Sequence, residues 1–213
     1  MPSRVVHMSV VAAALLALAA CSEEPSTDKA PVVQLGGPGE SSRTLSEGDL
    51  ADLADAGAHT PADVEFARNM IPHHRQALAM TALVPDRSQS RDLSLLAERM
   101  EVAQTDEIAQ LEQWLTARDE QVPGDHHHDA DEASMPGMLT DAELAKLAAA
   151  EGRRFERLFL QLMIRHHEGA IVMVQQLVDA GGGQEPTMFA LAQHIDADQR
   201  VEIGRMRSML VGL

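Results

Sequence analysis

The sequence predicts an all-α protein, a four-helix bundle built from two tandem helical hairpins with a long connection between them. Apolar residues recur at helical spacing in four stretches of about 25 residues, a pattern typical of helices that bury one face in a bundle. A block of 15 residues that begins at Phe66 recurs without a gap 93 residues later at Phe159, with seven identical positions. Because a second shared block follows each copy, we interpret the chain as two copies of one hairpin.

Two sequence motifs define these blocks. The first block contains Met-Ile-x-His-His at residues 70–74 and again at residues 163–167. The second block contains Gln-x-x-Glu-Ile at residues 104–108 and again at residues 199–203, where the offset between the copies has grown to 95 residues. The increase indicates that the loop inside the second hairpin is two residues longer.

Local signals set the limits of the first hairpin. Thr60 is a suitable N-cap with Pro61 in the first helical position, and the first helix is expected to run to about Val84. Pro72 lies inside this helix and predicts a kink beside the histidines, because it removes one backbone N–H. The second helix is expected over residues 89–117.

The second hairpin has similar signals. A capping box at residues 140–143 predicts a short helix that ends near Ala150. The third helix is expected over residues 152–180, because the three glycines at 181–183 are a C-terminal stop. A Glu-Pro pair at residues 185–186 begins the fourth helix.

The connection between the hairpins contains the His-, Met- and acid-rich segment 119–139. Some 33 residues separate the two hairpins. Bundle helices of about 25 residues span roughly 37 Å at 1.5 Å per residue, so the connection can travel the length of the bundle. This favours a ferritin-like crossover over a simple up-down-up-down arrangement.

The N-terminal region predicts export. Residues 1–20 are typical of a signal peptide, with an arginine and an apolar run too short to span a bilayer. The Leu-Ala-Ala-Cys sequence that ends at Cys21 resembles a bacterial lipobox, which favours lipidation of Cys21 over plain secretion. Residues 21–59 predict a disordered tether, and residues 60–213 form the bundle. The protein is therefore expected to be lipid-anchored to the bacterial cell membrane, facing outside the cytoplasm.

Charge and cysteine content exclude several partners. The formal net charge of −16 argues against nucleic acid and against an anionic membrane surface, since both favour clusters of Lys and Arg. The lipid on Cys21 is then the only predicted contact with the membrane. Cys21 is also the only cysteine, so the mature chain has no internal disulfide and no thiolate metal site.

Polar side chains interrupt the apolar stripes at matching places in the two hairpins. These side chains are His73, His74, Gln104 and Glu107 in the first hairpin, and His166, His167, Gln199 and Glu202 in the second. Met70 and Met163 lie three and four residues before the histidines, so thioether and imidazole share one helix face. Soft sulfur with imidazole suits Cu(I), and imidazole with carboxylate tolerates Cu(II). We therefore predict a copper site in which the histidines, methionines and glutamates are ligands and the glutamines support them.

The same residues have a purely structural interpretation. Burying a polar group without a partner costs about 1 to 3 kcal/mol, so these groups must pair with one another or with an ion. One His-Glu-Gln hydrogen-bond network in each hairpin would fix the register of the helices without binding anything. Four histidines in two matching pairs favour the metal site. The structural alternative stays open.

The connection holds a second group of metal-binding side chains. His126, His127 and His128 are followed by Met135-Pro-Gly-Met138. Because methionines in a polar segment have no core to fill, we interpret Met135, Met138 and the three histidines as an accessory arm that collects copper. A solvated linker is the alternative. Three adjacent histidines would also bind Zn(II) or Ni(II), so the arm alone does not identify the metal.

The doubled Met-Ile-x-His-His block, the Gln-x-x-Glu-Ile block after each copy and the Met-Pro-Gly-Met segment resemble the bacterial domain-of-unknown-function family 305, also called CopM-like. The resemblance covers about residues 63–210. It implies a secreted or periplasmic ferritin-like bundle, with some members binding copper and assisting copper resistance. The positions that match the family's motifs are the ten histidines, methionines, glutamates and glutamines of the predicted copper site.

Other function classes fit less well. Di-iron proteins of ferritin-like fold use Glu-x-x-His on two helices, and no glutamate here has a histidine three residues on. No nucleophile motif and no His-Glu-x-x-His indicates a hydrolase. We therefore predict a protein that is not an enzyme and that sequesters or transfers copper, with a copper-handling protein as candidate partner. The alternative is a lipid-anchored interaction module with a structural polar core; monomer and homodimer both stay open.

Overall fold

A computed structural model of the chain describes residues 31–34, 41–50, 57–124 and 135–213. The chain divides into two compact units, residues 1–46 and 47–213. The described part of the first unit contains one antiparallel pair of strands, β1 (Val33–Gln34) and β2 (Arg43–Thr44). This pair lies within the predicted disordered tether, where no strand was expected. The predicted signal peptide and Cys21 lie outside the described residues and stay predictions.

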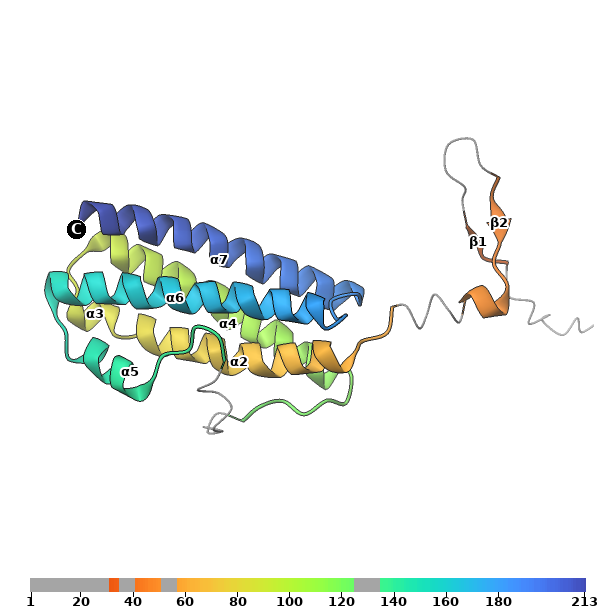
Figure 1. Cartoon of the computed structure of the whole chain (residues 1–213), viewed down its shortest axis with the longest axis horizontal. Coiled ribbons are helices and arrows are strands. Elements are labelled where there is room, and N and C mark those ends of the chain that lie inside the picture. Colours follow the sequence, from red (N-terminus) through yellow and green to blue (C-terminus); the bar gives the residue numbers. More distant parts are fainter. Residues whose placement is uncertain (1–30, 35–40, 51–56, 125–134) are drawn as a thin grey trace, which may run out of the picture. The chain divides into compact units, whose positions relative to one another are not determined.

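The second unit is helical, as the sequence predicts. Its four long helices are α2 (Pro61–Thr81), α4 (Arg91–Thr116), α6 (Gly152–Asp179) and α7 (Pro186–Gly212), and the short helices α3 (Val84–Arg87) and α5 (Asp141–Ala148) lie between them in the chain (Figure 1). The all-α class and the four-helix bundle are therefore confirmed. Among the described helices, none combines the length and the apolar character needed to cross a membrane.

The four long helices form two antiparallel hairpins that pack side by side. α2 packs against α4 and α6 against α7, and the hairpins meet through α2 with α6 and α4 with α7. The end of α6 lies beside the start of α2, where the Gly183 N–H donates a 2.6 Å hydrogen bond to Asp63 Oδ1. The chain between α4 and α6 therefore runs the length of the bundle (Figure 1). This is the predicted ferritin-like crossover.

The helix limits agree with the predicted ones except at the end of the first helix. Thr60 and Asp63 form a reciprocal capping box that begins α2, and α2 continues through Pro72. The helix ends at Thr81 instead of running to Val84. A separate turn, α3, starts there because the proline after Val84 cannot donate a backbone hydrogen bond to continue the helix.

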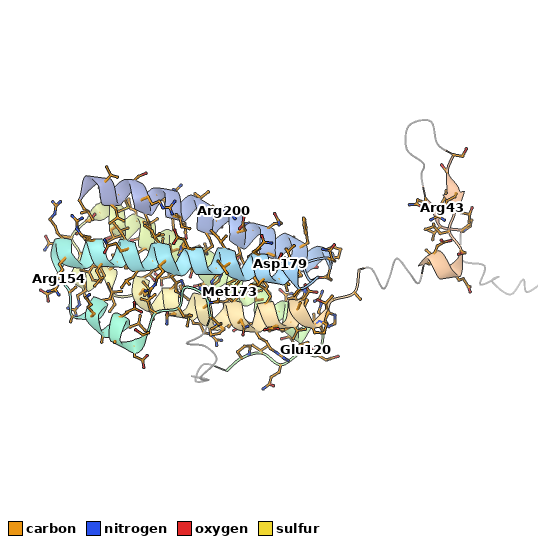
Figure 2. The ribbon with its side chains drawn as sticks, viewed as in Figure 1. Arg43, Glu120, Arg154, Met173, Asp179 and Arg200 are labelled. Atoms are coloured by element: carbon orange, nitrogen blue, oxygen red, sulfur yellow. The ribbon has the colours of Figure 1, made fainter. Side chains whose placement is uncertain are left out.

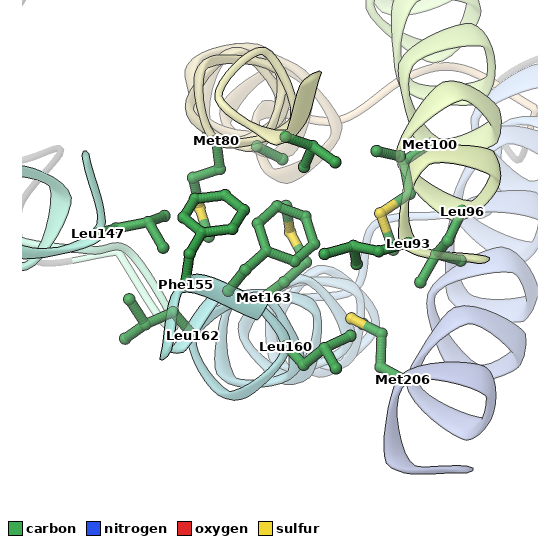
Figure 3. Packing of buried hydrophobic residues seen from close by; sticks show 14 of the residues in the cluster. Met80, Leu93, Leu96, Met100, Leu147, Phe155, Leu160, Leu162, Met163 and Met206 are labelled. Carbon is green, nitrogen blue, oxygen red and sulfur yellow. The ribbon is translucent and has the colours of Figure 1, made fainter. Parts of the chain in front are cut away.

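Apolar side chains fill the bundle in two clusters, one toward each end. One cluster contains Met80, Phe155 and Met163, which pack together in Figure 3. The other cluster contains Met70 and Trp114, near the start of α2 and the end of α4. Between the clusters the buried side chains are polar, and this polar region is the candidate site.

Many charged side chains lie on the outside of the bundle. Arg154, Asp179 and Arg200 are exposed on α6 and α7 (Figure 2). Arg200 holds Asp196 one turn earlier in α7 through contacts of 2.7 and 2.8 Å. Since this carboxylate is already paired, Asp196 serves below as a control position.

Candidate metal centre

The four histidines of the repeated motif lie together in a polar layer between the two apolar clusters. His73 and His74 of α2 and His166 and His167 of α6 are each at most 1% exposed. The rings of His73 and His166 face each other across the contact of α2 with α6, with centroids 3.8 Å apart and planes inclined by 35°. The fold therefore brings imidazoles from both hairpins to one place inside the bundle.

Each outer histidine meets the glutamate of its own hairpin. His167 Nε2 and Glu202 Oε2 are hydrogen-bonded at 2.7 Å. His74 Nε2 and Glu107 Oε2 are 2.8 Å apart, yet both carboxylate oxygens and this ring nitrogen lack a properly directed hydrogen bond. Because hydrogen bonds weaken steeply when misaligned, the short distance alone does not make this contact a hydrogen bond. The contact of His167 with Glu202 is therefore a satisfied hydrogen bond, whereas that of His74 with Glu107 is a close contact without a directed hydrogen bond.

The glutamines and methionines of the motifs are also buried. Gln104 and Gln199 are 2% and 1% exposed, and Gln104 Oε1 has no hydrogen-bond partner among the described residues. Met70 and Met163 are fully buried, and they belong to the two different apolar clusters on either side of the layer. Soft thioethers therefore flank the histidines from both ends of the bundle.

The connection between the hairpins closes over His73. His73 Nε2 donates a 3.1 Å hydrogen bond to the carbonyl of Pro136. A carbonyl only accepts, so Nε2 carries the proton and Nδ1 of the neutral ring keeps its lone pair. His73 Nδ1 is buried without a hydrogen-bond partner among the described residues, as is His166 Nε2. Lone pairs of this kind are the donors that a metal ion needs.

Two glycines allow this close approach. A Cβ atom at Gly169 of α6 would lie 2.1 Å from the Pro136 carbonyl oxygen, so any side chain there would displace the connection. Gly137 has a φ of +79°, and its Cβ would lie 2.8 Å from the backbone of α6. The segment Met135–Met138 is therefore seated directly on the α6 backbone beside the histidines.

The expectation that Met135 has no core to fill is wrong. Its side chain is partly buried and packs against the apolar cluster that contains Met70. The composition of this segment predicts a polar linker, but the crossover packs the segment against the bundle. Met138 is half-buried. The predicted arm histidines, His126 to His128, lie outside the described residues and stay a prediction.

Burial keeps the inner histidines neutral. Loss of solvation, helped by the neighbouring His74, lowers the pKa of His73 from 6.5 to about 3. Burial, helped by the neighbouring His73, likewise holds the pKa of His166 well below its usual value. Because metal ions bind unprotonated imidazole, His73 and His166 are ready to bind an ion at neutral pH without first losing protons.

The same shift predicts how stability depends on pH. We expect the metal-free protein to lose stability as the pH falls from 6.5 toward about 3, because unfolded histidine takes up a proton over this interval while His73 stays neutral. Urea denaturation across this range measures the slope. Replacing His73 and His166 together by Leu should flatten the slope, and an unchanged slope would contradict the assignment.

Sequence reasoning missed two features of this region. No sequence pattern predicts the role of the Pro136 carbonyl, because its contact with His73 depends on the path of the connection. His194 and Asp198 of α7 lie near Glu107, and their four-residue spacing was a usable signal that was not singled out.

Comparison with known proteins agrees with this architecture. No curated protein matches the chain. A DUF305 fragment from Deinococcus radiodurans is 35% identical with a TM-score of 0.65, covering 73% of this chain and 99% of that one. A DUF305 protein from Streptomyces coelicolor is 32% identical with a TM-score of 0.63, covering 71% of this chain and 91% of that one.

A third similar structure is CopM in its Cu(I)-bound form, which is 26% identical with a TM-score of 0.57. The match covers 70% of this chain and 96% of CopM. CopM has also been solved with Cu(II) and with silver bound. The sequence profile of the family described as Domain of unknown function (DUF305) matches residues 63–210, which is most of the chain. The chain therefore belongs to the DUF305 family.

Proposed function

We propose that this protein binds copper ions outside the cytoplasm and sequesters them or hands them on, without catalysing a reaction. The observation that carries the proposal is the histidine layer. Two neutral imidazoles from opposite hairpins face each other at 3.8 Å, and each has a buried ring nitrogen without a partner among the described residues. Unpaired buried nitrogens are costly, and a bound ion would satisfy both at once.

The choice of copper rests on the donors around the layer. Imidazole nitrogen with methionine sulfur suits Cu(I), and imidazole with the carboxylates of Glu107 and Glu202 suits Cu(II). Structures of the similar protein CopM hold Cu(I), Cu(II) and silver, the usual substitute for Cu(I). We propose that Met70 and Met163 turn their sulfur atoms toward the ion when it binds.

The proposal includes a location. We place the protein on the outer side of the cytoplasmic membrane, held by a lipid on Cys21 after removal of residues 1–20. A copper-handling protein that delivers or receives the ion is the proposed partner. Labelling with radioactive palmitate tests the anchor, because Cys21→Ser should abolish incorporation and release the protein.

We expect Cu(I) or Ag(I) to raise the melting temperature of the purified protein, while Mg(II) leaves it unchanged. A ligand at 100 times its Kd stabilises the native state by about 2.7 kcal/mol, which corresponds to a shift of roughly 5 to 10 °C for a chain of this size. His73→Ala combined with His166→Ala should abolish the shift. Calorimetry of protein prepared without an affinity tag measures it.

His59→Ala is the matched control, because it removes an imidazole that contacts Trp114 outside the histidine layer. This control should keep the full shift. If the double variant responds to silver as the natural protein does, the histidine layer does not bind the ion.

The structural alternative is favoured by one observation. The hydrogen bond of 2.7 Å between His167 and Glu202 is already satisfied and could fix the helices without an ion. In that case the protein would be a helical interaction module. The alternative predicts that neither Cu(I) nor Ag(I) changes the melting temperature, which is the opposite result in the same experiment.

A further inference from the structure

A second group of metal-binding side chains lies where α4 packs against α7. Glu107 of α4 and His194 and Asp198 of α7 each offer one ligand atom, and these three atoms lie within 4.8 Å of one another. His194 Nε2 and Asp198 Oδ2 are 3.4 Å apart. The side chains of His194 and Asp198 are 61% and 40% exposed, whereas that of Glu107 is 2% exposed. The group therefore reaches from solvent into the bundle.

Glu107 supplies an independent reason to expect a cation here. Both of its oxygens are buried and lack a hydrogen bond among the described residues. Its nearest ionisable neighbour in the histidine layer, His74, makes only a misaligned contact at 2.8 Å. A buried carboxylate without well-directed partners is unfavourable unless a positive charge compensates it. One oxygen of this carboxylate lies within 4.8 Å of the ligand atoms of His194 and Asp198 on α7.

The three donors define the chemistry of the ion. One imidazole nitrogen and two carboxylate oxygens suit a borderline divalent ion, and Cu(II) binds such sets most tightly among the common first-row ions. Bonds of about 2.1 Å in a tetrahedral arrangement place neighbouring ligand atoms about 3.4 Å apart. His194 and Asp198 already have this separation. Small side-chain rotations would bring Glu107 into range.

The repeat-related position around Glu202 has no such group. The repeat offset of 95 residues pairs His194 with Arg99 and Asp198 with Ala103. The counterpart of Glu107 is Glu202, which is hydrogen-bonded to His167. Glu202, which has no such ligands opposite it, is thus the satisfied carboxylate, and Glu107, which faces His194 and Asp198, is the unsatisfied one.

We propose that Glu107, His194 and Asp198 form a second metal site, open to solvent, that binds Cu(II). Glu107 belongs both to this site and to the contact with His74, so the outer ion sits one carboxylate away from the histidine layer. The inference deepens the proposed copper function and rests on it for the identity of the ion. The site itself rests on these three side chains alone.

Titration of the full chain with Cu(II) tests the proposal. All variants carry alanine at positions 126 to 128, because three adjacent histidines bind divalent ions themselves. His194→Ala with Asp198→Ala should remove one equivalent of bound Cu(II), or weaken it at least tenfold, together with a one-nitrogen coupling in the electron paramagnetic resonance spectrum. Both side chains are exposed, so the fold should be preserved, as circular dichroism can verify.

Asp196→Ala is the matched control, because it removes a carboxylate of the same helix that is bound to Arg200. It should keep the full Cu(II) stoichiometry. His73→Ala with His166→Ala should also keep the outer equivalent, so a failure of the histidine layer does not imitate a failure of this site. If the His194 and Asp198 variant binds Cu(II) as its parent does, the outer site is refuted while the proposed function stands.

Discussion

Replacing His74 by Leu should lower the free energy of unfolding by about 3 to 5 kcal/mol, because it removes the partner of a buried carboxylate and leaves Glu107 uncompensated. His74 is the ionisable side chain 2.8 Å from the Glu107 carboxylate, and Glu107 is 1% exposed. Water cannot easily replace the lost imidazole. Since small domains are stable by only about 5 to 15 kcal/mol in total, the variant should be visibly weakened in urea denaturation without metal.

A double variant separates charge from packing. His74→Leu with Glu107→Leu should recover most of the lost stability, because replacing both partners by apolar groups is often neutral or stabilising. The recovered protein should nevertheless lose Cu(II) binding at the outer site. If the double variant is as unstable as the single one, loss of shape and not an uncompensated charge explains the effect.

The second hairpin provides an internal comparison. His167→Leu should lower the free energy of unfolding less than His74→Leu does. Glu202 is 9% exposed, so water can reach its carboxylate once the imidazole is gone. Equal losses in the two hairpins would show that burial of the carboxylate does not control the cost.

Gly169→Ala is the second substitution with a large expected effect. Its Cβ would lie 2.1 Å from the Pro136 carbonyl oxygen, so the segment Met135–Met138 must move away from α6. Overpacking costs about 1 to 3 kcal/mol, and losing the hydrogen bond between His73 and Pro136 adds about 1 kcal/mol. We expect a total loss of about 2 to 4 kcal/mol in urea denaturation and faster proteolysis of the connection.

Gly204→Ala in α7 is the matched control. A Cβ there meets nothing within 4 Å, and alanine favours a helix over glycine by roughly 0.5 to 1 kcal/mol. The control should therefore be slightly stabilised. A Gly169→Ala variant as stable as this control would mean that the connection does not pack closely against α6.

Much of the fold could be predicted because its signals are local or periodic. Thr60 and Asp63 cap α2 through their own side chains, and the apolar stripes identify the buried faces. The crossover followed from the length of the connection alone. The exception was the end of α2 at Thr81, where a proline interrupts a pattern that otherwise continues.

The candidate site could be predicted only in part. The repeated motifs placed His73 and His166 on buried faces, and the bundle then brought the two rings together. The seating of Pro136 on Gly169 could not be predicted, because it depends on how a polar segment crosses a distant helix. The group at Glu107 and His194 was hidden for a similar reason, since its members come from different hairpins.

The crossover between α4 and α6 also governs the order of folding. Contacts within each hairpin join residues a few tens of positions apart, whereas His73 and His166 are separated by 93 positions. Closing the longer loop costs more chain entropy, so local contacts form sooner. We expect each hairpin to collapse on its own and the two to dock afterwards. An ion that needs imidazoles from both halves would then enter a nearly finished protein, and its arrival would mark the last stage of maturation.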